Sequence, residues 1–126
     1  MRLIPALLLA VLPAAPAAAY LAENGLVVEP IGKGEFHIPY RGLSRLSEFW
    51  CAAGDYGVRV LHLPPGQLIY RASEPPRRSG EGIRFTLDPD AAASTTGFTT
   101  FGGQGAGMTA RAAQSHCRNQ FQLPGH

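Results

Sequence analysis

The sequence is poor in cysteine, in net charge and in long apolar segments, and each shortage excludes a class of protein. Its 126 residues include two cysteines and carry a net charge of +2. A charge this small is too weak for a protein whose main task is to hold a nucleic acid backbone, so no nucleic acid partner is expected. The short length excludes a multidomain enzyme and a repeat array.

The first 19 residues have the pattern of a secretory signal peptide. Arg2 supplies positive charge, residues 3–12 are apolar apart from one proline, and small residues precede Tyr20 as signal peptidase requires. The apolar run is about half of the roughly 20 residues needed to span a bilayer, and no later stretch is long enough, so no membrane span is expected after cleavage. We therefore expect a signal peptide over residues 1–19, a single domain over residues 20–126, and a location in the periplasm or outside the cell.

The two cysteines, Cys51 and Cys117, would enter an oxidising compartment after export. An even pair in that setting predicts one disulfide. The alternative is a catalytic cysteine, because His116 is adjacent to Cys117. Adjacent side chains on a helix point about 100° apart and rarely form a working pair, so the structural bridge is favoured.

The first half of the expected domain combines a hairpin with a helix. Residues 25–31 and 35–40 are strand-like, and a short glycine-flanked connection joins them. Pro39 lacks the amide hydrogen that a central strand needs, which predicts that the second strand or its end lies at a sheet edge. From Leu43 to Leu61 the apolar residues recur at helical spacing, and this stretch is the expected main helix.

The sides of this helix are expected to differ. Trp50 falls on the apolar side, and Asp55 and Arg59 fall on the opposite side, which we expect to be solvated. Cys51 lies on the flank beside Gly54, where it can reach a second element. A glycine costs about 1 kcal/mol relative to alanine inside a helix, which suggests that something packs closely at Gly54.

The second half predicts further strands and a second helix. Residues 67–72, in which Leu68, Tyr70 and Ala72 alternate, and residues 83–88 are the next strands, followed by a last strand at 97–101. The glycine-rich residues 102–107 are expected to be a connector, and helical spacing follows from Ala110 to Phe121. The expected fold is α+β, in the order ββα-βββα, with an antiparallel sheet of four to five strands and two disulfide-joined helices on one face.

Few residue patterns point to catalysis or to a cofactor. The four histidines lack the spacing of metal ligands, so no metal is expected. The glycines of residues 102–107 match neither phosphate-binding register, so no nucleotide cofactor is expected. Glu48 and Asp55 lie about 10 Å apart along the helix axis and count only as surface charge. We therefore expect no cofactor and assign no catalytic residue.

Four arginines gather around the loop expected between the strands at 67–72 and 83–88. They could hold a carboxylate or phosphate group with paired hydrogen bonds. Glutamates interspersed among them favour the plainer interpretation of a solvated hairpin loop. Together with His37, on the outward face of its strand, these side chains are the candidates for contact with a ligand or partner: Arg71, Arg77, Arg78 and Arg84.

Two segments and the second cysteine carry a resemblance to a known family. Residues 49–61 read FWCAAGDYGVRVL and residues 75–88 read PPRRSGEGIRFTLD. With Cys117, they resemble an uncharacterised family of short secreted proteins of Gram-negative bacteria, which has no known activity. The resemblance implies a periplasmic setting, and it implies that the Trp50-Cys51 pair and Cys117 belong together. It implies no catalytic or binding residue.

These observations predict a small periplasmic, non-enzymatic binding or accessory module that is stabilised by one disulfide. Its partner would be a protein, an envelope component or a small ligand. Two alternatives stay open. One is a periplasmic enzyme with an unrecognised site, for which His37 and the arginine loop are the places to examine, and the other is a structural envelope protein.

Overall fold

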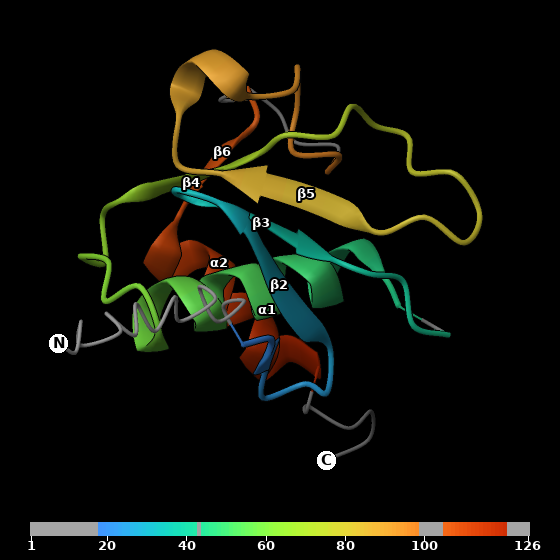
Figure 1. Ribbon diagram of the computed structural model, residues 1–126, viewed down its shortest axis with the longest axis horizontal. Helices are drawn as coiled ribbons and strands as arrows, with labels where there is room; N and C mark the ends of the chain where they lie inside the picture. The colour runs from blue at the N-terminus through green and yellow to red at the C-terminus, as the bar shows by residue number, and fades with distance from the viewer. Residues whose placement is uncertain (1–17, 43, 99–104, 121–126) are drawn as a thin grey trace, which may run out of the picture.

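The computed structural model describes residues 18–42, 44–98 and 105–120, which form one antiparallel sheet and two α-helices (Figure 1). The strands are β1 (Tyr20–Leu21), β2 (Val27–Gly32), β3 (Glu35–Ile38), β4 (Leu68–Arg71), β5 (Ile83–Thr86) and β6 (Gly107–Thr109). The helices are α1 (Leu46–Arg59), the short 3₁₀ helix η1 (Pro89–Ala91) and α2 (Ala110–Gln120). Across the sheet the strands follow the order β1-β2-β3-β5-β4-β6.

The predicted fold class is confirmed: an antiparallel sheet carries two helices that a disulfide joins. The described sheet has six strands in place of the expected four to five. β1 is an additional strand at one edge, and β6 at the other edge begins inside the stretch expected to be a connector. The strand expected at residues 97–101 is absent at Gly97 and Phe98, and the rest of it lies outside the described residues.

A glycine in β6 explains why a connector was expected where a strand begins. Gly107 pairs with Tyr70 of β4. A β-carbon on Gly107 would come within 2.9 and 3.1 Å of two atoms of the Tyr70 ring. The glycine therefore makes room for a cross-strand tyrosine, whereas sequence rules treat a glycine run as flexible.

The centre of the sheet is an aromatic core. Phe36 of β3 is paired with Phe85 of β5, and their rings stack with centroids 5.7 Å apart. Trp50 meets the Phe85 ring edge-on at 4.9 Å. Of the two alternatives, that the second strand or only its end lies at a sheet edge, the first is wrong, because β3 pairs with β2 on one side and β5 on the other. The strand ends at Ile38, so Pro39 needs no strand partner.

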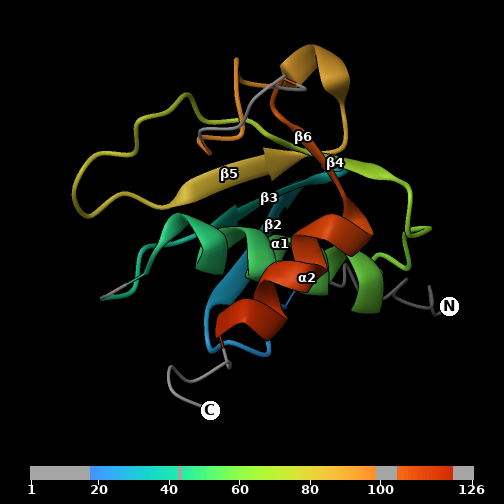
Figure 2. The same ribbon diagram turned by 180° about the vertical axis from the view of Figure 1, so that it is seen from behind.

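Helix α1 is surrounded by other elements. It lies between β2 and α2, as the two opposite views show (Figures 1 and 2). All nine residues from Phe49 to Gly57 are buried, including Asp55. The expectation that Asp55 lies on a solvated face is therefore wrong, whereas Arg59 is exposed as expected. An acid followed by a base four residues later is typical of a helix surface, but here the chain around β1 covers the acid.

Helix α2 packs against α1 through a glycine and a disulfide. The Cys51–Cys117 disulfide is confirmed, with the two Cα atoms 4.7 Å apart. Close packing at Gly54 is also confirmed, because a β-carbon there would lie 2.7 Å from the carbonyl carbon of Ala113. The second helix begins at Ala110 as expected, and Phe121 lies outside the described residues.

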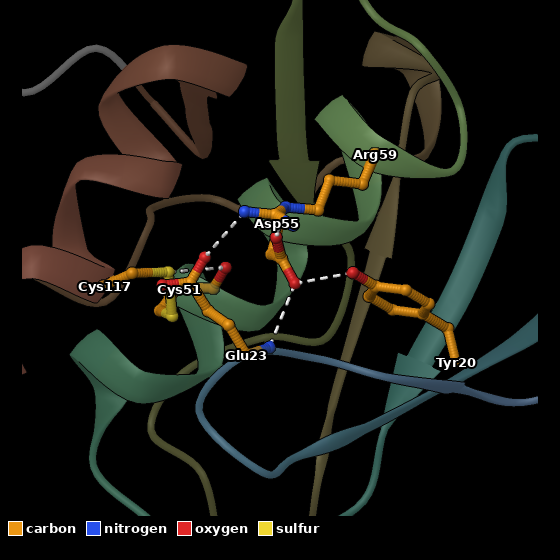
Figure 3. A network of polar contacts seen from close by, with 6 residues as sticks. All are labelled: Tyr20, Glu23, Cys51, Asp55, Arg59 and Cys117. Carbon is orange, nitrogen blue, oxygen red and sulfur yellow. Dashed lines mark hydrogen bonds and ion pairs between the residues drawn. A yellow bond between two sulfur atoms is a disulfide. The ribbon is translucent and has the colours of Figure 1, made fainter.

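The buried Asp55 fastens the N-terminal strand to α1 (Figure 3). Its carboxylate accepts hydrogen bonds from the hydroxyl of Tyr20, at 2.8 Å, and from the amide of Glu23, at 3.0 Å. Its other oxygen lies 2.8 Å from Nε of Arg59. Burial, followed by the hydrogen bond to Asp55 and its negative charge, raises the pKa of Tyr20 to about 12. We call these four residues the Asp55 network.

The raised pKa of Tyr20 predicts a loss of stability at high pH. The contribution of Tyr20 is fully present below pH 10.0, its ordinary pKa, and is lost as the pH rises toward about 12. Tyr20→Phe should lower the free energy of unfolding by about 2 kcal/mol at pH 8, because a hydrogen bond to a charged group is lost. When urea unfolding is measured from pH 8 to 12, the difference in free energy of unfolding between the two proteins should disappear at high pH.

The comparison with Tyr20→Phe separates this effect from that of Tyr56, whose pKa burial also raises. Both proteins keep Tyr56, so its titration cancels in the difference between them. A constant difference from pH 8 to pH 12 would contradict the assignment to Tyr20.

Candidate functional site

A pocket opens between the start of α1 and the loop that joins β4 to β5. The two segments project from the same end of the sheet in both views (Figures 1 and 2). The pocket has a volume of about 450 Å³, within the range of small-molecule sites. Its walls come from three places in the chain: the segment before and into α1, the β4–β5 loop, and strand or loop positions beside them. The lining residues are Ser44, Arg45, Leu46, Arg71, Pro75, Pro76, Arg77, Ile83, Thr95 and Gly97.

Arg71 brings a buried positive charge to this pocket. It is the last residue of β4 and is only 2% exposed. Its Nε donates to the carbonyl of Ser73 at 2.8 Å, and its Nη1 donates to the carbonyl of Thr96 at 3.2 Å. Within the described residues no carboxylate oxygen lies within 4.0 Å of it. Buried charges normally have an ionic partner, so Arg71 lacks the partner that its burial would lead one to expect.

The nearby acid is engaged elsewhere. Both carboxylate oxygens of Glu74 accept from the amide of Ser94, at 2.9 and 3.0 Å. Burial is the main cause that lowers the pKa of Arg71, the positive charge of Arg77 lowers it further, and Glu74 acts in the opposite direction. The two arginines thus repel each other, and an anion placed between them would relieve the repulsion.

The local backbone is shaped to admit Arg71. In β4 the buried residues are Ile69 and Arg71, while Leu68 is 39% exposed. The apolar alternation of Leu68, Tyr70 and Ala72 therefore marks the face of β4 turned away from the buried one. Gly97 has a φ of +97°, and a β-carbon there would collide with Nη1 of Arg71. Glycine at 97 is thus required both by the backbone conformation and by the guanidinium group.

Arg77 is held at the pocket by aromatic rings and by backbone carbonyls. Its guanidinium carbon lies 4.8 Å from the ring centre of Tyr40 and 5.3 Å from that of Phe49. Its Nη1 donates to the carbonyls of Arg78 and Glu81, at 3.2 and 2.9 Å. Stacking on aromatic faces and a fixed fork of donors are the features with which arginine binds carboxylates and phosphates.

The start of α1 adds positive potential. Arg45 occupies the N-cap position, and no side chain caps the helix there. The hydroxyl of Ser44 donates instead to the carbonyl of Arg41 at 2.7 Å. The first turn of a helix carries unsatisfied amide groups and the positive end of the helix dipole, which favour a bound anion.

Only two of the five residues proposed from the sequence for ligand contact line the pocket. Arg71 and Arg77 line the pocket together. Arg78 and Arg84 are exposed and do not line it. His37 lies opposite Arg84 in the register of β3 and β5, and its Nδ1 is 3.1 Å from a carboxylate oxygen of Glu29. His37 and Arg84 therefore belong to a polar row across the sheet and not to the pocket.

Sequence reasoning missed Arg45, and it placed Arg71 in the expected strand 67–72 but grouped it with the arginines around the following loop. Arg45 precedes the first helical residue. The absence of Ser, Thr, Asp or Asn at that N-cap position could have indicated that no side chain caps the start of the helix. Arg71 has no such signal, because the Thr96 carbonyl that accepts from it is distant in the sequence. The indole of Trp50 and the guanidinium of Arg71 both donate to the Thr96 carbonyl.

Other parts of the described structure give less support for a functional site. In the described ranges, no three His, Cys, Asp or Glu side chains lie together as a metal site would require. His116 stacks on Phe98 with ring centres 5.1 Å apart, and burial lowers its pKa, which favours the neutral form of the ring. None of the helices in the described part of the chain is long and apolar enough to cross a membrane.

Comparison with known proteins returned no match to a family model, to a curated protein or to a solved structure.

Proposed function

We propose that this protein is a small exported binding module, without enzymatic activity, that holds an anionic group in the pocket between α1 and the β4–β5 loop. The bound group would be a carboxylate or a phosphate. Arg71 and Arg77 would donate to it, and the start of α1 would add a favourable dipole.

The observation that carries this proposal is the burial of Arg71 beside a pocket and without an ionic partner among the described residues. A buried charge that serves stability alone is usually paired. A second arginine at the same pocket makes the unpaired charge more costly still. An arrangement that is costly without ligand and favourable with an anion is typical of a binding site.

The proposal of an exported protein rests on separate support. The disulfide between Cys51 and Cys117 fits an extracellular or periplasmic protein, because cytosolic thiols are normally kept reduced. The signal-peptide pattern of residues 1–19 agrees with that location. Intact mass spectrometry of the protein purified from its host would test both points. The mass should correspond to a chain that begins at Tyr20 and should be lower by two hydrogens because of the disulfide.

Replacing Arg71 should separate binding from stability. Arg71→Met should weaken the binding of phenyl phosphate or benzoate by about tenfold or more, because a hydrogen bond to a charged group contributes about 1.5–3 kcal/mol. The same variant should change the free energy of unfolding by no more than about 1 kcal/mol, since removing an unpaired buried charge offsets the lost hydrogen bonds. Isothermal titration calorimetry and urea unfolding measure the two effects.

Neighbouring arginines provide matched controls. Arg77→Met should weaken binding, whereas Arg78→Met should leave it unchanged, although the two residues are adjacent and the charge removed is the same. Arg84→Met should also have no effect. If the variants of Arg77 and Arg78 behave alike, the arginines act only through overall charge and the pocket is not the site. If neither probe binds the unaltered protein, the proposed function is wrong.

A further inference from the structure

We infer that the anion held in this pocket is a dianionic phosphate monoester that carries an apolar organic group. This inference rests on the proposed function and specifies the ligand class. It follows from three features of the pocket: its charge, its free donors and its apolar wall.

The charge of the pocket exceeds what one carboxylate can balance. Three of the described lining residues are arginines, and none is acidic. Arg71 is almost completely buried, so the solvent screens its charge poorly. A carboxylate would bring one negative charge, while a phosphate monoester brings close to two at neutral pH. The dianion therefore leaves less uncompensated positive charge in the pocket.

The donors that remain free suit three terminal oxygens better than two. Bonds within the described chain occupy Nε and Nη1 of Arg71, which leaves Nη2 for a ligand. In Arg77 they occupy Nη1 and leave Nε and Nη2, which form one edge of the guanidinium fork. A carboxylate can fill that edge with its two oxygens, and a bond to Arg71 must then share one of those oxygens. A phosphate monoester has a third terminal oxygen for the second arginine.

The remaining wall of the pocket is apolar. Leu46, Pro75, Pro76 and Ile83 contribute side chains without hydrogen-bonding groups. Free inorganic phosphate would leave this wall in contact with water. An organic group on the phosphate would cover it, and the burial of apolar area favours binding.

Calorimetric titration of the full protein with three probes tests the inference. Phenyl phosphate and phenyl sulfate have nearly the same shape but differ by one negative charge at pH 7.5, and inorganic phosphate lacks the ring. Phenyl phosphate should bind about tenfold more tightly than each of the other two, a difference of about 1.4 kcal/mol. Equal affinity for phenyl phosphate and either comparison probe would overturn the inference, while the proposed function would stand. Absence of binding by all three probes and by benzoate would overturn both.

A second titration at pH 5 distinguishes the charge of the ligand from that of the protein. The second pKa of a phosphate monoester is about 6, so phenyl phosphate becomes a monoanion and its affinity should fall toward that of phenyl sulfate. The lining residues include no histidine and no acid. The hydrogen bonds from Ser94 lower the pKa of Glu74, the acid that interacts with Arg71, so Glu74 stays ionised. An unchanged affinity of phenyl phosphate at pH 5 would contradict the inference.

Discussion

Removal of the Cys51–Cys117 disulfide is expected to lower the free energy of unfolding by about 4 kcal/mol. The bridge spans 66 residues, and the chain-entropy model assigns about this value to closing a loop of that length. Small domains have a total stability of about 5–15 kcal/mol, so the loss is a large part of the whole. The double variant Cys51→Ala/Cys117→Ala should melt about 15–30 °C below the oxidised protein in a circular dichroism scan.

Reduction of the unaltered protein provides the control for this prediction. A phosphine reductant should lower its melting temperature to that of the double variant, and the reductant should leave the double variant unchanged. Melting temperatures that agree within a few degrees with and without the bridge would show that packing of α1 on α2 suffices without it.

A single methyl group at Gly54 should have the second largest effect. A β-carbon at this position would lie 2.7 Å from the carbonyl carbon and 2.8 Å from the β-carbon of Ala113 in α2. The obstacle includes backbone, which cannot rotate away, and the disulfide holds α2 in place one turn from the contact. Gly54→Ala should destabilise the protein by about 2–3 kcal/mol in urea unfolding, more than the gain of about 1 kcal/mol in helix propensity.

Gly57, one turn further along the same helix, is the matched control. A β-carbon at Gly57 would lie 3.0 Å from Cδ1 of Ile69 and 3.1 Å from Cδ1 of Leu63, which are the ends of flexible side chains. Gly57→Ala should therefore change stability by no more than about 1 kcal/mol, because repacking costs offset the gain in helix propensity. In the disulfide-free background the cost of Gly54→Ala should shrink, since α2 can then move back. Equal effects of the two alanines would contradict the close contact.

The parts of the fold that could be predicted depend on local periodicity and on small residue sets. The hairpin of β2 and β3 has its glycine-flanked turn, the main helix has its apolar spacing and its prolines beyond the end, and the disulfide has only two cysteines to join. Gly54 signalled a close approach because glycine is unfavourable in a helix. In each case the information lies within a few residues or follows from the compartment that the sequence predicts.

The parts that could not be predicted depend on contacts between distant residues. Asp55 is buried because Tyr20 and Glu23 reach it from 35 and 32 residues away. Arg71 occupies an inward position of β4, where sequence rules expect an apolar side chain. Its acceptor at Thr96 is 25 residues away, beyond the range of any spacing rule. The candidate site lies where the local rules fail, and local rules fail most often at functional or strained positions.

The position of α2 has a consequence for the time at which this protein can fold. Helix α1 is enclosed partly by α2, and the contact that joins them connects residues 66 positions apart. A nascent chain that has left the ribosome only as far as β5 can form the hairpin and α1, but one side of α1 still faces water. The core therefore closes only when α2 is available, and long-range closure of this kind is slow. The proposed export would benefit from this delay, because translocation channels pass extended chains and folding awaits α2.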